Sequence, residues 1–184
     1  MKKHQIILDV AIDLFLANGF DGTGIEQIIT AANASRGGLY HHFKDKQTLF
    51  KAVLDKLFIQ PMQSMSFDNF AKMPLKQQQA MLVELYRTMP QTMDAMTHHG
   101  VGKYFALYFD SLSRVPEFGA SVRNYYTKLL DILQISIAKE RGLTLTEAHH
   151  QARAFLARLE GELYLCAVLG DTPEFSKLTQ EMEL

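Results

Sequence analysis

Apolar residues recur along the chain at the spacing of an α-helix. In the first segment they follow one another at intervals of three and four residues, which places them on one helical face: Ile7, Val10, Ala11, Leu14 and Phe15. Gly19 follows at the position where many helices end in a left-handed residue. The same spacing returns after Pro116 and after Thr144, and no alternating strand pattern is sustained. The pattern therefore predicts an all-α protein.

Short polar signals divide the first sixty residues into four helices. Thr23 and the glutamate three residues later have the spacing of a capping box, which predicts a second helix to about residue 32. Asn33 tolerates a left-handed backbone and predicts a tight turn. Ser35 opens a third helix of about two turns, and Asp45 caps a fourth, which Pro61 is expected to end or bend.

The rest of the chain predicts longer helices, interrupted at proline and glycine. Pro90 is expected to kink or end a helix, and Gly100 and Gly102 to break the chain before the next one. The expected segments are an irregular stretch over 62–74, a helix over 76–90, a shorter piece to residue 99, and long helices over 116–141 and 144–169.

The second and third helices, short and joined by a tight turn, predict a helix-turn-helix. In that motif the second helix enters the major groove, and residues near its N-terminus meet base edges. The stretch "SRGGLYHHFKDKQTLF", residues 35–50, fits this use. Gly37 and Gly38 each cost roughly 1 kcal/mol against alanine in a helix interior, but glycine permits close backbone approach to DNA. We therefore predict that this helix lies against DNA.

The run from Gly19 to Phe50 resembles the DNA-binding signature of TetR-family transcriptional repressors. The agreeing positions are Gly19, Phe20, Thr23, Ser35, Gly37, Leu39, Tyr40, His42, Phe43, Asp45, Lys46 and Leu49. Two positions depart from it: Gly24 stands where family members often carry a second Thr or Ser, and Asn33 replaces the usual turn glycine. The resemblance implies a helix-turn-helix DNA-binding domain over 1–58 and a helical effector-binding and dimerisation domain over 59–184.

The resemblance also implies roles for individual residues. Arg36 is expected to make a bidentate contact with guanine, and Gly38 and His41 to face bases. Leu39 and Phe43 are expected to anchor the helix in the core. Phosphate contacts are expected from Tyr40, His42, Lys46 and the Thr23 hydroxyl. The full set expected at the DNA is Thr23, Ser35, Arg36, Gly38, Tyr40, His41, His42 and Lys46.

The last two long helices carry apolar stripes that, in the family, belong to a four-helix interface between two subunits. The residues expected there are Leu129, Leu133, Phe155, Leu159 and Leu163. The other interpretation of these stripes is that they serve only the core of the single chain. A twofold homodimer suits a helix-turn-helix, because it places two reading helices at half-sites about 34 Å apart.

Methionines and aromatic residues gather between the two regions and suit adaptable binding of a small hydrophobic or aromatic effector. The candidate ligand-binding residues are Met89, Met93, Phe105, Tyr108, Phe109 and Tyr126, although each could equally belong to the core. Glu84, Asp94 or Asp110 would favour a cationic ligand if it faced inward. We therefore expect a ligand-responsive repressor that leaves a palindromic operator when its effector binds.

The charge balance keeps other possibilities open. The 184 residues have a formal net charge of −1, and residues 1–58 hold seven Lys or Arg against six Asp or Glu. DNA affinity must then come from local charge. One alternative is a helical ligand-binding or interaction module without specific DNA binding. Another is a constitutive DNA-binding protein whose core has no room for an effector.

Other features of the sequence argue against further classes of site. Cys166 is the single cysteine, which excludes an intramolecular disulfide. The three His-His pairs place adjacent rings about 100° apart on a helix, so we expect no metal site. No motif indicates a cofactor or an enzyme. Asp9 and Asp13 interrupt the apolar N-terminal stretch, and no run approaches the roughly 20 residues of a membrane span. We expect a cytoplasmic protein without a membrane partner.

Overall fold

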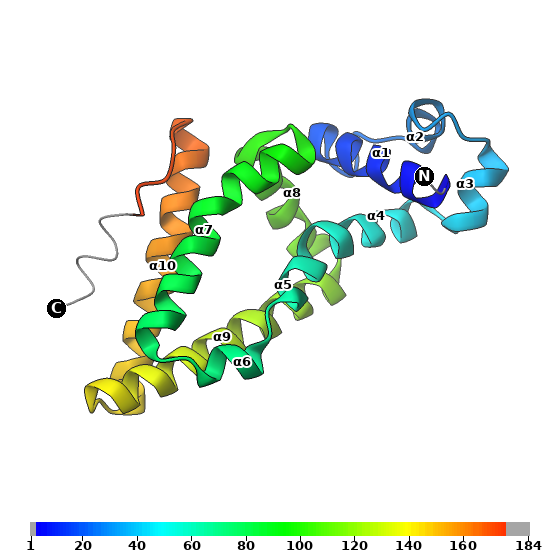
Figure 1. Ribbon diagram of the computed structural model, residues 1–184. Coiled ribbons are helices and arrows are strands. Elements are labelled where there is room, and N and C mark those ends of the chain that lie inside the picture. Colours follow the sequence, from blue (N-terminus) through cyan, green and yellow to red (C-terminus); the bar gives the residue numbers. More distant parts are fainter. Residues whose placement is uncertain (1–2, 176–184) are drawn as a thin grey trace. The chain divides into compact units, whose positions relative to one another are not determined.

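The computed structural model describes residues 3–175, apart from the side chains of residues 96 and 97, and this range is helical without strands (Figure 1). The all-α prediction is confirmed. The elements are α1 (Lys3–Asn18), α2 (Ile25–Ala31), α3 (Arg36–His42), α4 (Lys46–Leu54), the π-helical turn η1 (Asp55–Ile59), α5 (Gln60–Ser64), α6 (Phe67–Lys72), α7 (Leu75–Thr97), α8 (Gly100–Arg114), α9 (Pro116–Arg141) and α10 (Leu145–Leu169).

The chain forms two compact units, one of residues 1–64 with 97–121 and the other of residues 65–96 with 122–184. The first unit contains the predicted helix-turn-helix together with α8. The second contains α6, α10 and most of α7 and α9. None of the helices within the described range combines the length and the apolar character needed to cross a membrane.

Helix α1 is the centre of the N-terminal unit, because α2, α3, α4 and α8 all pack against it. Phe15, on its buried face, is fully inaccessible to solvent. The Phe15 ring meets Phe50 of α4 edge to face, with ring centres 4.9 Å apart, and Phe20 lies 4.8 Å from Phe50. Burying one such side chain contributes about 2 kcal/mol, so this aromatic cluster joins α1 firmly to α4.

The predicted helix ends and caps of this unit are largely confirmed. Gly19 ends α1 with φ 72°, and Asn33 adopts φ 45° in the turn between α2 and α3. The Ser35 Oγ accepts the Gly38 N–H at 3.0 Å. Asp45 Oδ1 accepts the Thr48 N–H at 2.7 Å, and this bond holds the pKa of the Asp45 carboxyl below its usual value. Local side-chain caps thus set the start of α3 and the start of α4.

The predicted cap of α2 was wrong. Gly24, not Thr23, precedes the helix, and its N–H donates to Gln27 Oε1 at 2.6 Å. Thr23 is only 1% exposed, and its hydroxyl lies 3.0 Å from the Leu14 carbonyl oxygen and 2.8 Å from that of Gly19. Thr23 therefore stabilises the end of α1 from inside the domain.

The predicted breaks in the middle of the chain were also partly wrong. Pro61 does not end a helix, because α4 passes through the π-helical turn η1 into α5. A π-helical turn shifts backbone hydrogen bonding by one residue, and the Gln60 N–H donates to the Asp55 carbonyl oxygen. Helix α7 continues through Pro90, and α8 contains Gly102 after the break at Gly100. Residues 62–74, expected to be irregular, include part of α5 and all of α6.

The C-terminal unit buries the apolar faces of α7, α9 and α10. Helix α9 stops at Gly142 with φ 66°, as predicted. Thr144 and Glu147 then form the predicted capping box, in which the Thr144 Oγ1 accepts the Glu147 N–H and a Glu147 carboxylate oxygen accepts the Thr144 N–H at 2.9 Å. Helices α7 and α10 run side by side (Figure 1), where the Tyr86 hydroxyl donates to Glu160 at 2.5 Å.

We predict that the left-handed backbone at Asn33 limits which residues the turn accepts. A residue with a Cβ and no local hydrogen-bonding group costs about 1 kcal/mol or more at such a φ value. Asn33→Ala should therefore lower the free energy of unfolding by about 1 kcal/mol, whereas Asn33→Gly should leave it unchanged or raise it. Urea denaturation of the three proteins measures this, and equal stability of the alanine and glycine variants would contradict it.

Candidate nucleic-acid interface

Helix α3 has two faces with opposite character. Leu39 and Phe43 are 0% and 3% exposed, so their predicted role as core anchors is confirmed. The opposite face is open to solvent, and its spacing of one, three and four residues makes it one continuous surface. The exposed residues on it are Arg36, Gly37, Tyr40 and His41. The helix is therefore held by one side and presents the other.

The two glycines of α3 have different neighbours. A Cβ at Gly38 would lie 3.0 Å from the Ser35 Oγ, the oxygen that caps the helix, so this position favours glycine for a local reason. A Cβ at Gly37 would meet nothing within 4 Å. No packing in the described part of the chain requires a glycine at position 37. The fold itself therefore does not explain why the helix carries the free-energy cost of Gly37.

Arg36, the expected guanine reader, forms an ion pair with Glu26 in the first turn of α2. The Arg36 Nε lies 3.1 Å from Glu26 Oε1, and Nη2 donates to the same oxygen. This hydrogen bond and the Glu26 charge raise the pKa of the arginine. Both side chains stay mostly exposed, at 70% and 65%. The structure thus gives Arg36 a partner that we did not predict from the sequence.

The expected phosphate-contacting residues differ in their surroundings. Tyr40 is 44% exposed. The His42 ring meets His4 edge to face at 5.5 Å, and His4 stacks on Phe43 at 4.8 Å. The Lys46 ammonium lies 4.2 Å above the Phe20 ring, a cation–π contact. Tyr40 and His42 are therefore on the surface, and the position of Lys46 is set by the aromatic side chain beneath it.

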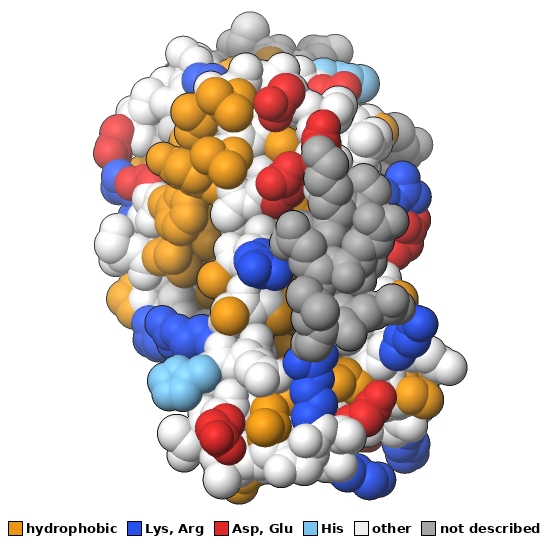
Figure 2. Space-filling view, turned by 90° about the vertical axis from the view of Figure 1, so that its left-hand side faces the viewer, with side chains coloured by type: hydrophobic (Ala, Val, Ile, Leu, Met, Phe, Trp, Pro, Cys, Tyr) orange, Lys and Arg blue, Asp and Glu red, His pale blue; other side chains and the backbone are white. Residues whose placement is uncertain are grey.

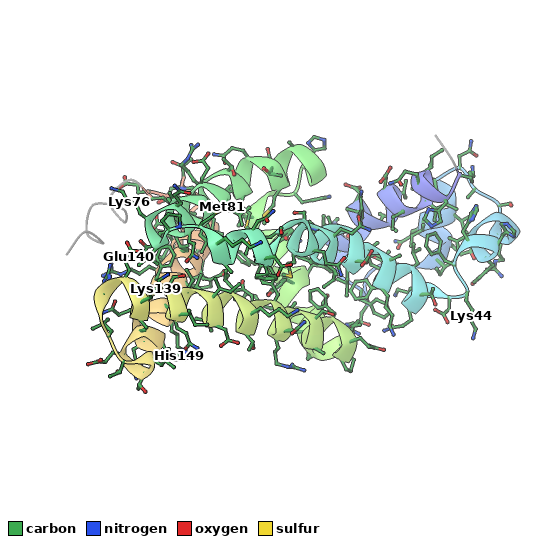
Figure 3. The ribbon with its side chains drawn as sticks, turned by 60° about the horizontal axis from the view of Figure 1, so that its bottom comes forward. Lys44, Lys76, Met81, Lys139, Glu140 and His149 are labelled. Carbon is green, nitrogen blue, oxygen red and sulfur yellow. The ribbon has the colours of Figure 1, made fainter. Side chains whose placement is uncertain are left out.

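The structure changes the predicted set of DNA-contacting residues at two positions. The buried Thr23 hydroxyl faces backbone carbonyls, so Thr23 does not present it to a phosphate here. Lys44, which we did not single out, is exposed in the turn between α3 and α4, where Figure 3 shows its side chain projecting outward. Its basic side chain, two residues beyond the end of α3 and directly after an anchoring aromatic residue, could have identified it.

The five residues expected at a dimer interface are buried within the single chain. Leu129, Leu133 and Leu159 are 0% exposed, and Phe155 and Leu163 are 5% and 1% exposed. These five side chains fill the core of their own unit, and in the single chain they present almost no surface to a second copy. Figure 2 shows a band of apolar side chains on the outer face of α10, and the exposed residues that α10 contributes are Tyr164, Leu165, Val168 and Leu169.

The candidate ligand-binding residues belong to both units. Met89, Met93 and Tyr126 lie in the C-terminal unit; Met93 is 5% exposed and the other two are partly buried. Three lie on α8 in the N-terminal unit: Phe105 stacks on Phe109, which is 57% exposed, and Tyr108 contacts Phe58 at 5.3 Å. The structure does not bring these six residues together within one unit.

The carboxylates suggested for a cationic ligand face outward. Glu84 binds Arg87 and Asp110 binds Arg114, and Asp94 is exposed. Glu160 instead is partly buried in the C-terminal unit and accepts hydrogen bonds from Tyr86 and Tyr126. Burial, followed by the nearby Glu160 charge, raises the pKa of both Tyr86 and Tyr125. Single-sequence spacing gave no signal for this cluster, which forms between three helices.

Residues 7–53 match the family model described as bacterial regulatory proteins, tetR family. The HTH-type transcriptional regulator QacR of Staphylococcus aureus is 43% identical over 55 residues, 30% of this chain and 29% of that protein. The HTH-type transcriptional regulator AcrR of Shigella flexneri is 47% identical over 52 residues, 28% of this chain and 24% of that protein. The chain thus matches less than a third of the length of these relatives.

The fold extends the similarity beyond the matched segment. A TetR transcription regulator from Haloarcula marismortui superposes with a TM-score of 0.67 at 17% sequence identity, covering 97% of this chain and 93% of that one. The family match includes the helix-turn-helix, and the structural likeness covers nearly the whole chain. The segment 7–53 therefore matches the TetR family of bacterial regulatory proteins, and the chain has the fold of a solved TetR regulator.

Proposed function

We propose that the protein is a ligand-responsive transcriptional repressor that binds a palindromic operator as a homodimer. The observation that carries the proposal is the exposed face of α3, which presents Arg36, Tyr40 and His41 while Leu39 and Phe43 hold the helix on α1. Base reading needs side chains on a helix that packing holds in one orientation. The relatives, named as transcriptional regulators, support this function.

The DNA contacts follow from this placement. Arg36 reads guanine in the major groove, with His41 as the second reader and Gly38 close to the bases. Tyr40, His42, Lys46 and the Ser35-capped start of α3 contact phosphates, and Lys44 adds a positive charge at the far end of the helix. These positions supply local positive charge in a chain whose net charge is −1.

Dimerisation is proposed through the outer face of α10 rather than through the five buried residues. Gly161 lies in the middle of this helix, and a Cβ there would meet nothing within 4 Å. A glycine in a helix interior costs roughly 1 kcal/mol, and no contact in the described chain explains it. A small residue between Ala157 and Leu165 lets a helix of a second copy approach closely, as small residues do at helix crossings.

The effector is proposed to be a small hydrophobic or aromatic molecule held in the C-terminal unit. Met89, Met93 and Tyr126 are the candidate contacts there, and the Glu160 carboxylate with its two tyrosines supplies a polar group among them. Phe105, Tyr108 and Phe109 of α8 remain candidates for ligand contact as well. The effector lowers operator affinity only to the extent that it binds the DNA-free state more tightly.

The open space at Gly37 leads to a paired prediction on stability and DNA binding. Gly37→Ala should raise the free energy of unfolding by up to about 1 kcal/mol, because alanine favours the helix and meets no neighbour. The same methyl group should weaken operator binding on the order of tenfold, or about 1.4 kcal/mol, by separating the helix from DNA. Urea denaturation and fluorescence anisotropy with a selected duplex measure the two effects.

Gly38→Ala is the matched control for stability. Its methyl group would lie 3.0 Å from the capping Ser35 Oγ, so this variant should gain less stability than Gly37→Ala or lose it. A Gly37→Ala protein that is more stable and binds the duplex as tightly as wild type would contradict the proposed approach of α3 to DNA.

The apolar band on α10 predicts where a charge separates the dimer. Val168 is 61% exposed in the single chain, so Val168→Glu should leave the monomer fold intact but place a carboxylate in the subunit interface. Sedimentation velocity should show a dimer for wild type and a monomer for this variant. Phe109→Glu, at a similarly exposed position on α8, should remain dimeric. If Val168→Glu stays as dimeric as that control, α10 is not the interface.

A further inference from the structure

We propose that Glu26 is a positioning residue for sequence reading: its carboxylate orients the Arg36 guanidinium so that its outer edge faces guanine. This inference rests on the proposed function, because it concerns how α3 reads DNA. It adds a residue of the first helix of the motif to the readers on the second helix.

The geometry of the pair leaves the reading edge available. Glu26 Oε1 accepts hydrogen bonds from Nε and Nη2 of Arg36, which lie on one side of the planar guanidinium. The Nη1 group makes no hydrogen bond with any residue of the range 3–175. A guanidinium has five donors in a rigid fork, so Nη1 and the second N–H of Nη2 can still donate together to O6 and N7 of one guanine.

The position of the pair explains why orientation is needed. Arg36 is the first residue of α3, and the next residue, Gly37, gives its side chain no neighbouring Cβ to pack against. An exposed arginine retains much rotamer freedom, which binding must remove at a cost in affinity. Glu26 sits on α2, which Ala32 and the Asn33 turn join directly to α3. A carboxylate fixed on one helix therefore restrains a long side chain on the other.

The same carboxylate has an opposite effect on overall affinity. Glu26 adds a negative charge close to the surface proposed to meet phosphates, and phosphate contacts dominate affinity for any sequence. Removing the charge should therefore tighten binding to all duplexes. Removing the hydrogen-bond acceptor as well should reduce discrimination at the base pair that Arg36 reads. A change in affinity for all duplexes reports the charge of Glu26, whereas a change in discrimination at one base pair reports its positioning of Arg36.

The test measures the affinity ratio for two duplexes by fluorescence anisotropy at fixed salt. One duplex carries the operator selected by the wild-type protein, and the other has the guanine read by Arg36 replaced by adenine. Glu26→Ala should bind both more tightly but lose about tenfold of the ratio, because a bidentate guanine contact depends on orientation. Glu26→Gln, which keeps an acceptor oxygen, should bind both more tightly and retain most of the ratio.

Asp9→Ala is the charge-matched control, since this exposed α1 carboxylate binds Gln5 and not an arginine. It should leave the ratio at the wild-type value. If Glu26→Ala also keeps the wild-type ratio, Glu26 acts only through its charge and the inference is overturned.

A second measurement tests the pair without DNA. The ¹⁵N-edited NMR signal of the Arg36 Nε–H should exchange more slowly with water in wild type than in Glu26→Ala. Equal exchange rates would overturn the inference while leaving operator binding intact. If the wild-type protein selects no duplex at all, the proposed function fails and this inference fails with it, so the two failures are distinguishable.

Discussion

The burial of the apolar face of α1 is the interaction on which the N-terminal unit depends. Helices α2 and α3 have seven residues each, too few to be stable alone in water. They form because Ile28 and Leu39, both fully buried, pack on the core that Phe15 centres. The Lys3 ammonium, from the first residue of α1, also binds the carbonyl oxygen of Asn33 and so holds the turn between them.

In the short helix α3, the residues that pack on the core are different from the residues that face solvent. The residues of α3 that point inward are apolar and fully packed, so the orientation of the helix is determined by its packing on α1 and α2. The outward residues take little part in that packing, which leaves their chemistry available for a partner. Gly37 is the clearest case, because a Cβ at this position would meet nothing within 4 Å. No packing among the described residues therefore offsets the helix stability that this glycine loses.

Much of this could be predicted from the sequence, because local chemistry determines it. Asn33, Ser35, Asp45 and Gly142 adopt the predicted conformations or caps, since each depends on residues only a few positions away. The cap of α2 was missed because Thr23 finds acceptors on α1, outside its own turn. The helix stops considered at Pro61 and Pro90 do not occur, because α4 continues through the π-helical turn η1 into α5 and α7 runs through Pro90.

The features that depend on contacts between helices were the hardest to predict. Periodicity identified the apolar stripes of α9 and α10, but it cannot tell which stripe meets the chain's own core and which meets a second copy. Leucines on one face fill the core, while Tyr164, Leu165 and Val168 on the outer face near Gly161 remain exposed. The Glu26–Arg36 pair and the Glu160 cluster join residues of different helices, so spacing along one helix carried no sign of them.

The most direct test of the central claim is selection of bound duplexes from a random DNA pool at about physiological salt by wild type and Arg36→Ala. If α3 of a homodimer reads DNA, the wild-type protein should enrich a palindrome whose half-sites lie about one helical turn, or a multiple of it, apart. The arginine variant should then lose one guanine preference symmetrically in both halves. A pool without any enriched motif, the same for both proteins, would contradict the account.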